Sequence, residues 1–83
     1  MTKELQKLRK QIDKIDKKIK KQLSKRELLV KEVGKTKKYL GLELEDLERE
    51  AKVLTGLGEN YVGKIYKKII EESKNIQKHL WPL

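Results

Sequence analysis

Residues 3–40 form one uninterrupted amphipathic run, which constrains this 83-residue chain more than any other feature. The run has no proline, and its first glycine is Gly34. Alternating steps of four and three residues follow a heptad-like seam, typical of a long helix that packs lengthwise against other helices. The seam consists of Leu8, Ile12, Ile15, Ile19, Gln22, Arg26, Leu29, Val33, Thr36 and Leu40. Because a glycine inside a helix costs about 1 kcal/mol relative to alanine, we expect Gly34 to mark the close approach of another backbone or a ligand.

The expected length of this helix indicates more than one chain. It would be roughly 55 Å long at the usual rise per residue, whereas a compact globule of this chain length would be about 30 Å across. Only 36% of the residues are hydrophobic, and oligomerisation is a common remedy for a small core. We therefore expect the helix to need a second chain.

The rest of the sequence predicts two further helices. Gly41 suits the position just after the end of the first helix, and a second helix is expected to begin around Asp46. That helix is short, because Thr55–Gly58 is a strong stop followed by a turn. A third helix is expected over residues 59–79, and no segment has a strand pattern. The predicted fold is all-α, with three helices per chain, one of them very long. We expect residues 1–83 to form a single domain that intertwines with a second copy as a helical homodimer.

Composition excludes several classes of site. The chain has no cysteine and a single histidine, His79, which argues against thiolate or imidazole metal centres and against a Ser-His triad. No run is long and apolar enough for a membrane span, and the amino terminus lacks the apolar region of a signal peptide. We expect a cytoplasmic protein without a metal site.

The charge is strongly positive and unevenly placed. The net charge is +9, and residues 1–40 alone carry 15 Lys/Arg against 5 Asp/Glu. Such a helix could attract nucleic acid, an anionic membrane or a small polyanion, or could simply present a solvated lysine face. The basic residues include only three arginines, Arg9, Arg26 and Arg49. Arginine differs from lysine by its planar fork, which holds carboxylate or phosphate through two parallel hydrogen bonds.

Two basic residues share one face of the first helix. Arg26 lies on the seam, and Lys37 follows eleven residues later. At 100° per residue the two directions agree to within about 20°, and the residues lie about 16 Å apart along the axis. Their long side chains could bracket one small anion.

The other two helices bring their own polar sets to apolar faces. Ser73 and Gln77 are an i, i+4 pair in line with the buried side of the third helix. Asp46, Arg49 and Glu50 share a face of the second helix by the same spacing. Three facing polar sets predict a polar pocket inside a helix bundle.

Each of these signals also has a purely structural interpretation. A polar seam residue can specify register or oligomeric state, and Ser73 can bond to its own helix backbone. Arg49 and Asp46 can form a weak surface ion pair, and Gln77 can be a partly exposed residue at a helix end. The coincidence of these residues on facing stripes favours the functional interpretation.

Arg9 needs a second chain if it is to join the same site. Seventeen residues separate it from Arg26, about 25 Å along the helix axis. Both side chains cannot reach one small ligand from the same chain. An antiparallel partner helix would bring Arg9 of one chain beside the middle of the other, which predicts a site shared across the dimer.

Five segments, in order along the chain, carry a family resemblance. They are Leu8–Asp16, Lys25–Arg26, Val33–Lys37, Asp46–Glu50 and Ile69–Ser73, the last followed by Gln77. Together they resemble the all-helical chorismate mutases over nearly the whole chain. In that family three helices per chain interlock into a homodimer with two equivalent active sites. One departure is the segment Ala51–Tyr61, which is about two helical turns shorter than in the better-known members.

The resemblance implies roles for the residues that bind substrate carboxylates. Arg26, together with Arg9 from the partner chain, would bind the carboxylates of chorismate. Lys37 and Ser73 would assist them.

The resemblance also implies roles at the ether and the ring. Lys37 and Gln77 would donate hydrogen bonds to the ether oxygen. Glu50 would hold the ring hydroxyl, helped by the backbone near Asp46, and Arg49 would support the site.

The implied reaction is the rearrangement of chorismate to prephenate, which is unimolecular. It needs no nucleophile, metal or redox cofactor, and the expected partners are the dianionic substrate and a second copy rather than nucleic acid or a membrane. Two alternatives remain open at this point. One is an enzyme like the isochorismate-pyruvate lyases, which use a similar basic pocket. The other is a non-enzymatic basic helical dimer that binds polyanions, whose binding would fall steeply with salt.

Overall fold

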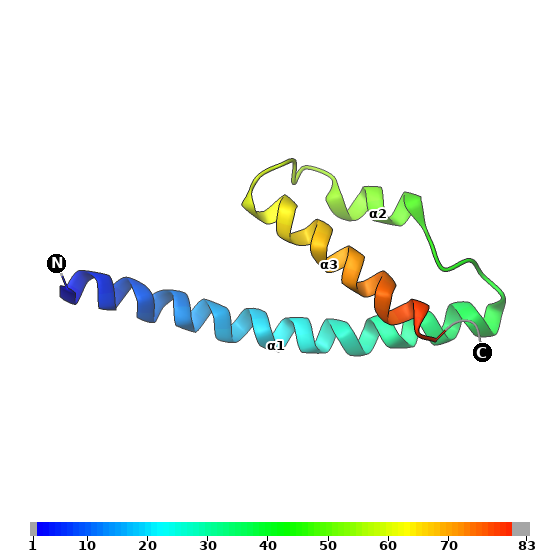
Figure 1. Cartoon of the computed structure of the whole chain (residues 1–83), viewed down its shortest axis with the longest axis horizontal. Coiled ribbons are helices and arrows are strands. Elements are labelled where there is room, and N and C mark those ends of the chain that lie inside the picture. The colour runs from blue at the N-terminus through cyan, green and yellow to red at the C-terminus, as the bar shows by residue number, and fades with distance from the viewer. Residues whose placement is uncertain (1, 81–83) are drawn as a thin grey trace.

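The computed structural model describes residues 2–80 and contains three α-helices (Figure 1). Helix α1 spans Thr2–Leu40, α2 spans Leu47–Leu54 and α3 spans Tyr61–Lys78. Residues 2–80 contain no strand, which confirms the all-α prediction. The third helix is shorter than predicted, because Asn60 caps its start and His79 its end.

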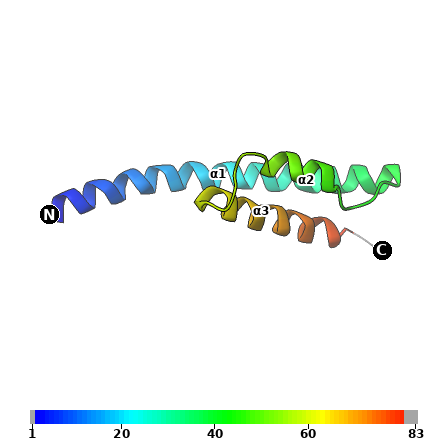
Figure 2. The same ribbon diagram turned by 90° about the horizontal axis from the view of Figure 1, so that it is seen from above.

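Helix α1 determines the shape of the chain. The described residues extend 57 Å along the longest axis and only 24 and 14 Å along the others. Figures 1 and 2 show α3 lying along the carboxyl-terminal half of α1, while the amino-terminal half extends alone. The predicted overhang is therefore present in the single chain.

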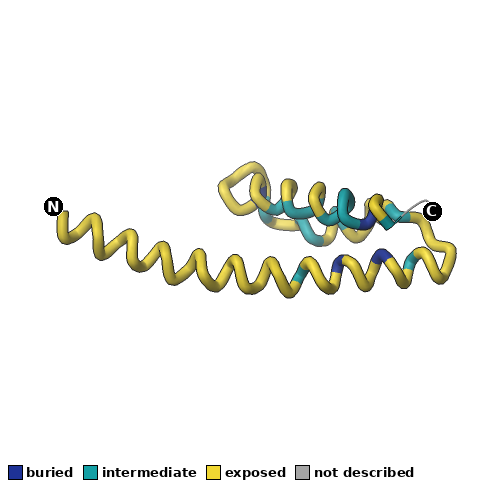
Figure 3. The backbone as a smooth tube through the Cα atoms, turned by 60° about the horizontal axis from the view of Figure 1, so that its bottom comes forward, coloured by how far each residue is buried: buried dark blue, intermediate teal, exposed yellow. Residues whose placement is uncertain are grey.

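The projecting half of α1 has an uncovered apolar seam. Every residue from 2 to 25 is exposed (Figure 3). This includes the seam residues Leu8, Ile12 and Ile15, which are 55%, 55% and 57% exposed. Within the described chain, the buried residues of α1 lie only in the half that α3 contacts.

Two local motifs fix the ends of the helices around the connection between α1 and α2. Gly41 adopts a left-handed φ of 69°, the conformation that ends many helices. The Gly41 amide donates to the Lys38 carbonyl and the Leu42 amide donates to the Lys37 carbonyl, which satisfies two of the carbonyls in the last turn of α1. At the start of α2, the Asp46 carboxylate accepts a hydrogen bond from the Arg49 amide at 3.0 Å, as an N-cap does.

Helix α3 packs closely on α1 at Gly34. A Cβ atom placed on Gly34 would lie 2.7 Å from Leu80 Cδ1 and 3.1 Å from Gln77 Cγ. The approach is close, but the neighbours are the side chains of Gln77 in α3 and of Leu80 just beyond it, not the backbone or ligand that the sequence had predicted. Val30, one turn earlier, is only 9% exposed and is the buried hydrophobic residue of the described chain.

Replacing Gly34 by leucine should lower the free energy of unfolding by about 1–3 kcal/mol, because the added side chain would overpack this contact. The measurement is urea unfolding followed by circular dichroism at a fixed protein concentration. Lys31→Leu is the matched control, since Lys31 is exposed on the same helix, and it should change stability by less than about 0.5 kcal/mol. Equal effects of the two leucines would contradict the close packing of α3 on Gly34.

Over residues 2–80, no helix combines the length and the apolarity that crossing a membrane requires.

Candidate active site

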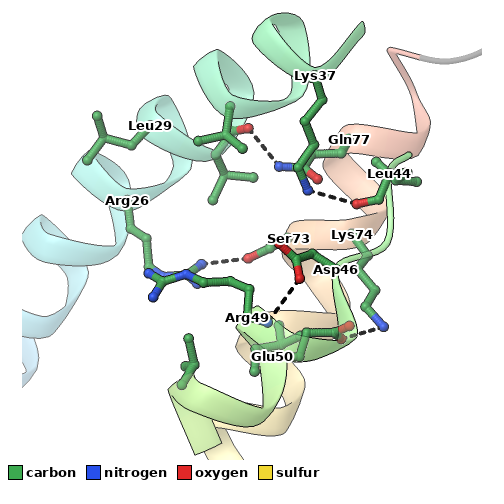
Figure 4. A pocket seen from close by; sticks show the side chains of 14 residues that line it. Arg26, Leu29, Lys37, Leu44, Asp46, Arg49, Glu50, Ser73, Lys74 and Gln77 are labelled. Atoms are coloured by element: carbon green, nitrogen blue, oxygen red, sulfur yellow. Dashed lines mark hydrogen bonds and ion pairs between the residues drawn. The ribbon is translucent and has the colours of Figure 1, made fainter. Parts of the chain in front are cut away.

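A cavity of about 300 Å³ lies where the three helices meet (Figure 4). Its polar lining residues are Arg26 and Lys37 from α1, Asp46, Arg49 and Glu50 from the start of α2, and Ser73, Lys74 and Gln77 from α3. Its apolar lining residues are Leu29, Val30, Val33, Leu44, Val53 and Ile70. All the site residues predicted from the sequence, apart from Arg9, thus line one cavity.

Arg26 and Ser73 join α1 to α3 at one side of the cavity. Arg26 Nη1 donates to Ser73 Oγ at 2.5 Å, and Ser73 Oγ donates to the Ile69 carbonyl at 2.7 Å. Ser73 therefore does bond back to its own helix, as the structural interpretation proposed, and it also orients the guanidinium. Because a guanidinium has five N–H donors, Arg26 keeps further donors for a ligand.

Gln77 and Lys37 lie near the other end of the cavity. Gln77 is 7% exposed, so its interpretation as a partly exposed residue at a helix end is wrong. Its Nε2 donates to the Val30 carbonyl at 3.1 Å, which uses one of its two amide hydrogens. Lys37 Nζ donates to the Leu44 carbonyl at 2.8 Å, a bond that holds the ammonium against the connection before α2.

Asp46 has a structural role in this arrangement. Its carboxylate caps α2 through the Arg49 backbone amide. The ion pairs of the described residues do not include a pair between the Asp46 and Arg49 side chains. The sequence had offered such a surface pair as the structural interpretation of these two residues.

Glu50 is the second acidic residue of the cavity lining, and α3 supplies its partner. Lys74 Nζ lies 2.5 Å from Glu50 Oε1 and 2.9 Å from Glu45 Oε1. The Glu50 side chain is 20% exposed, and its other oxygen, Oε2, is buried without a hydrogen-bond partner. A buried acceptor of this kind is costly to leave unpaired, so a donor that reached this oxygen would be stabilised.

Sequence reasoning missed Lys74. It is one of nineteen lysines, and composition gave no reason to single it out. The available signal was its position: Lys74 and Gln77 are three residues apart and so share a helix face. Hydrogen bonds to Glu50 and then Glu45 raise the pKa of Lys74, and the bond from Lys74 lowers the pKa of Glu45.

Arg9 lies away from this cavity. It is on the exposed amino-terminal half of α1, and the cavity's lining does not include it. The distance along α1 from Arg9 to Arg26 is about 25 Å, so the cavity of this chain is out of its reach.

The cavity suits a small dianion. Its charged side chains are the cations Arg26, Lys37, Arg49 and Lys74 and the carboxylates Asp46 and Glu50. Because the cations outnumber the carboxylates by four to two, net positive charge is available to an anionic ligand. Among the described residues, His, Asp and Glu side chains form no group of three or more that could hold a metal ion.

Comparison with known proteins gives matches that cover most of the chain. Residues 8–78 match the family described as Chorismate mutase type II. A chorismate mutase from Methanocaldococcus jannaschii is 36% identical over 87 aligned positions, covering 94% of this chain and 88% of the relative. Among solved structures, a conserved hypothetical protein from Pyrococcus furiosus is 46% identical with a TM-score of 0.81, covering 88% of this chain and 93% of that one.

Proposed function

The chain belongs to the chorismate mutase type II family and is an isomerase, and from that premise we propose how its three-helix cavity rearranges chorismate to prephenate. The reaction is a step of aromatic amino acid biosynthesis. Chorismate is a dianion with a ring hydroxyl and an ether bond that breaks during the rearrangement. An enzyme must hold the folded conformer and stabilise the charge that develops on the ether oxygen.

Arg26 binds a substrate carboxylate in this proposal. Its half-buried guanidinium is oriented by Ser73 at 2.5 Å, so little side-chain freedom is lost when the anion binds. Arg49 lines the same cavity from α2 and supports the site as a second cation.

Lys37 and Gln77 donate to the ether oxygen. Each is fixed by one hydrogen bond to a backbone carbonyl, of Leu44 and Val30 respectively. Each therefore retains donors that do not have to be reoriented as the ether bond breaks. Donors fixed in advance at a position of developing charge are among the most effective catalytic devices.

Glu50 accepts a hydrogen bond from the ring hydroxyl, and this residue is the observation that carries the proposal. In a cavity with four cationic side chains, it presents one buried oxygen without a partner. A site built only for a polyanion has no use for such an acceptor, because the carboxylate would repel the ligand. A ligand with both negative charges and a hydroxyl donor fits both features.

Arg9 enters the site through a second copy of the chain. Support comes from the uncovered apolar residues in the projecting half of α1, which are 40–57% exposed: Leu5, Leu8, Ile12, Ile15, Ile19 and Leu23. The seam continues into a second cavity of about 380 Å³ beside Arg26, lined partly by Leu23, Ile65, Ile69 and Ile76. An antiparallel partner helix laid on this surface would cover both and would bring its Arg9 toward Arg26. The proposed assembly is a homodimer with two shared sites.

The direct test is the conversion of chorismate by the purified chain. Micromolar protein should consume chorismate, followed by loss of its absorbance, and form prephenate. Arg26→Ala should reduce the rate by about a hundredfold, since it removes a donor for the substrate carboxylate. A wild-type rate equal to that of buffer would overturn the assignment. Pyruvate release from isochorismate, at a rate above that of chorismate conversion, would favour a lyase instead.

A further inference from the structure

Lys74 stands between two carboxylates at the edge of the cavity, and its contacts define its role. Its ammonium bonds Glu50 Oε1 at 2.5 Å and Glu45 Oε1 at 2.9 Å. Glu45 belongs to the connection before α2, Glu50 to the first turn of α2 and Lys74 to α3 (Figure 4 shows the Lys74–Glu50 pair). One ammonium therefore ties α2 and its connection to α3.

The two bonds also restrict what Lys74 can do. An ammonium has three N–H donors, and two of them are already directed at carboxylates. A swing toward a substrate carboxylate would break charge-assisted bonds on a side chain that is only 30% exposed. Lys74 is therefore poorly placed to be a further ligand for chorismate.

Glu50, in contrast, needs an external constraint. Its carboxylate can rotate about the side-chain bonds, and in the proposed site it lies next to a dianionic substrate that repels it. The bond from Lys74 engages one oxygen and offsets the charge, while the second oxygen stays buried and without a partner. The second oxygen is therefore left for a hydroxyl donor from the ligand.

We propose that Lys74 is a positioning residue, which holds the Glu50 carboxylate so that its second oxygen accepts the ring hydroxyl of chorismate. The inference rests on the proposed role of Glu50 and adds to it a residue that acts only through Glu50. It follows that the contribution of Lys74 should disappear when the Glu50 carboxylate is removed.

The test is a double-mutant cycle with chorismate as the substrate. Lys74→Met should lower kcat/KM about tenfold, equivalent to about 1.4 kcal/mol. In a Glu50→Gln background the same change should alter kcat/KM by less than about twofold, since residues acting as a unit are not additive. Lys74→Arg, which keeps the charge and the donors, should recover kcat/KM to within about threefold of wild type.

Two control variants distinguish the positioning of Glu50 from a purely structural role of Lys74 in joining α2 to α3. Glu45→Gln removes the outer carboxylate but keeps the pair with Glu50, so kcat/KM should stay within about twofold of wild type. Lys67→Met removes an exposed ammonium of the same helix, which pairs with Glu59 and lines neither cavity, and it should have no effect. If Lys74→Met fails to fold, as judged by circular dichroism, the comparison of Lys74→Arg with Glu45→Gln still tests the inference. A Glu45→Gln loss as large as that of Glu50→Gln would then overturn it.

The outcomes distinguish this inference from the function on which it rests. Equal losses from Lys74→Met in the two backgrounds would overturn the positioning role while the mutase activity stands. An unchanged kcat/KM in Glu50→Gln would overturn the role of Glu50 and this inference together. Absence of wild-type turnover would overturn the proposed function itself.

Discussion

Lys37→Ala is expected to lower kcat/KM by about 10²–10³-fold, whereas Lys38→Ala should change it by less than about threefold. The two lysines are neighbours near the end of α1, and each donates to a backbone carbonyl, Lys37 to Leu44 at 2.8 Å and Lys38 to Leu80 at 2.9 Å. Only Lys37 lines the cavity. The comparison therefore holds charge, helix position and type of hydrogen bond nearly constant.

The physical reason for the difference is where the positive charge is placed. A cationic donor within the cavity stabilises the charge that develops on the ether oxygen, and it cannot be replaced by mobile water without reorganisation. A cation on the exposed side acts through solvent and is screened by salt. The measurement is steady-state kinetics at two salt concentrations, with thermal unfolding to check that both variants fold. Similar losses of kcat/KM in the two variants would show that the positive charge of α1 acts collectively and not through the position of Lys37 in the cavity.

The long helix was predictable because its signals are local and repeated. The seam from Leu8 to Leu40 repeats over several heptads, and Gly41 supplies the left-handed residue that ends it. The cap of α2 is equally local, since Asp46 needs only the amide of Arg49 three residues later. Such features depend on neighbours in sequence, which periodicity and capping rules describe directly.

For the candidate site, the sequence predicted which residues share a helix face, but not how closely those faces approach one another. Helical spacing placed Arg26 with Lys37 and Ser73 with Gln77, and the structure brings both pairs to one cavity. Spacing carries no information on how closely two helices approach. The contact of Lys74 with Glu50 joins residues of α3 and α2 that are twenty-four positions apart. The choice of this lysine among nineteen depends on tertiary packing.

The exposed half of α1 is a second case in which the sequence pattern is local but the packing is not. The sequence places apolar residues along the whole helix, yet α3 is too short to cover more than the second half. The periodic pattern predicts that this surface of α1 packs against another helix, but it does not specify which chain supplies that helix. The role of Arg9 depends on that missing information, so it has to be tested by an experiment on assembly.

Mixing inactive Arg9→Ala and Arg26→Ala chains should restore about a quarter of wild-type activity. Each variant alone should retain about 1% or less, since every site lacks one of the two guanidiniums. In the proposed two-fold symmetric dimer, each site would take Arg26 from one chain and Arg9 from its partner. A heterodimer then has one site with both arginines and one site with neither. With free exchange, about half of the dimers are heterodimers, so about a quarter of all sites are complete.

The control for this experiment is a pair of variants that affect the same half of the site. Arg26 and Lys37 line the cavity of a single chain, so mixing Arg26→Ala with Lys37→Ala leaves every site of the heterodimer defective. That mixture should stay inactive, while Arg9→Ala mixed with Lys37→Ala should recover activity as the first pair does. Subunit exchange is verified by native mass spectrometry of chains that differ by a small tag. Exchange without recovery in either Arg9 mixture would show that Arg9 does not act across the interface, and recovery in the control mixture would show that the cavity is not built as a unit from one chain.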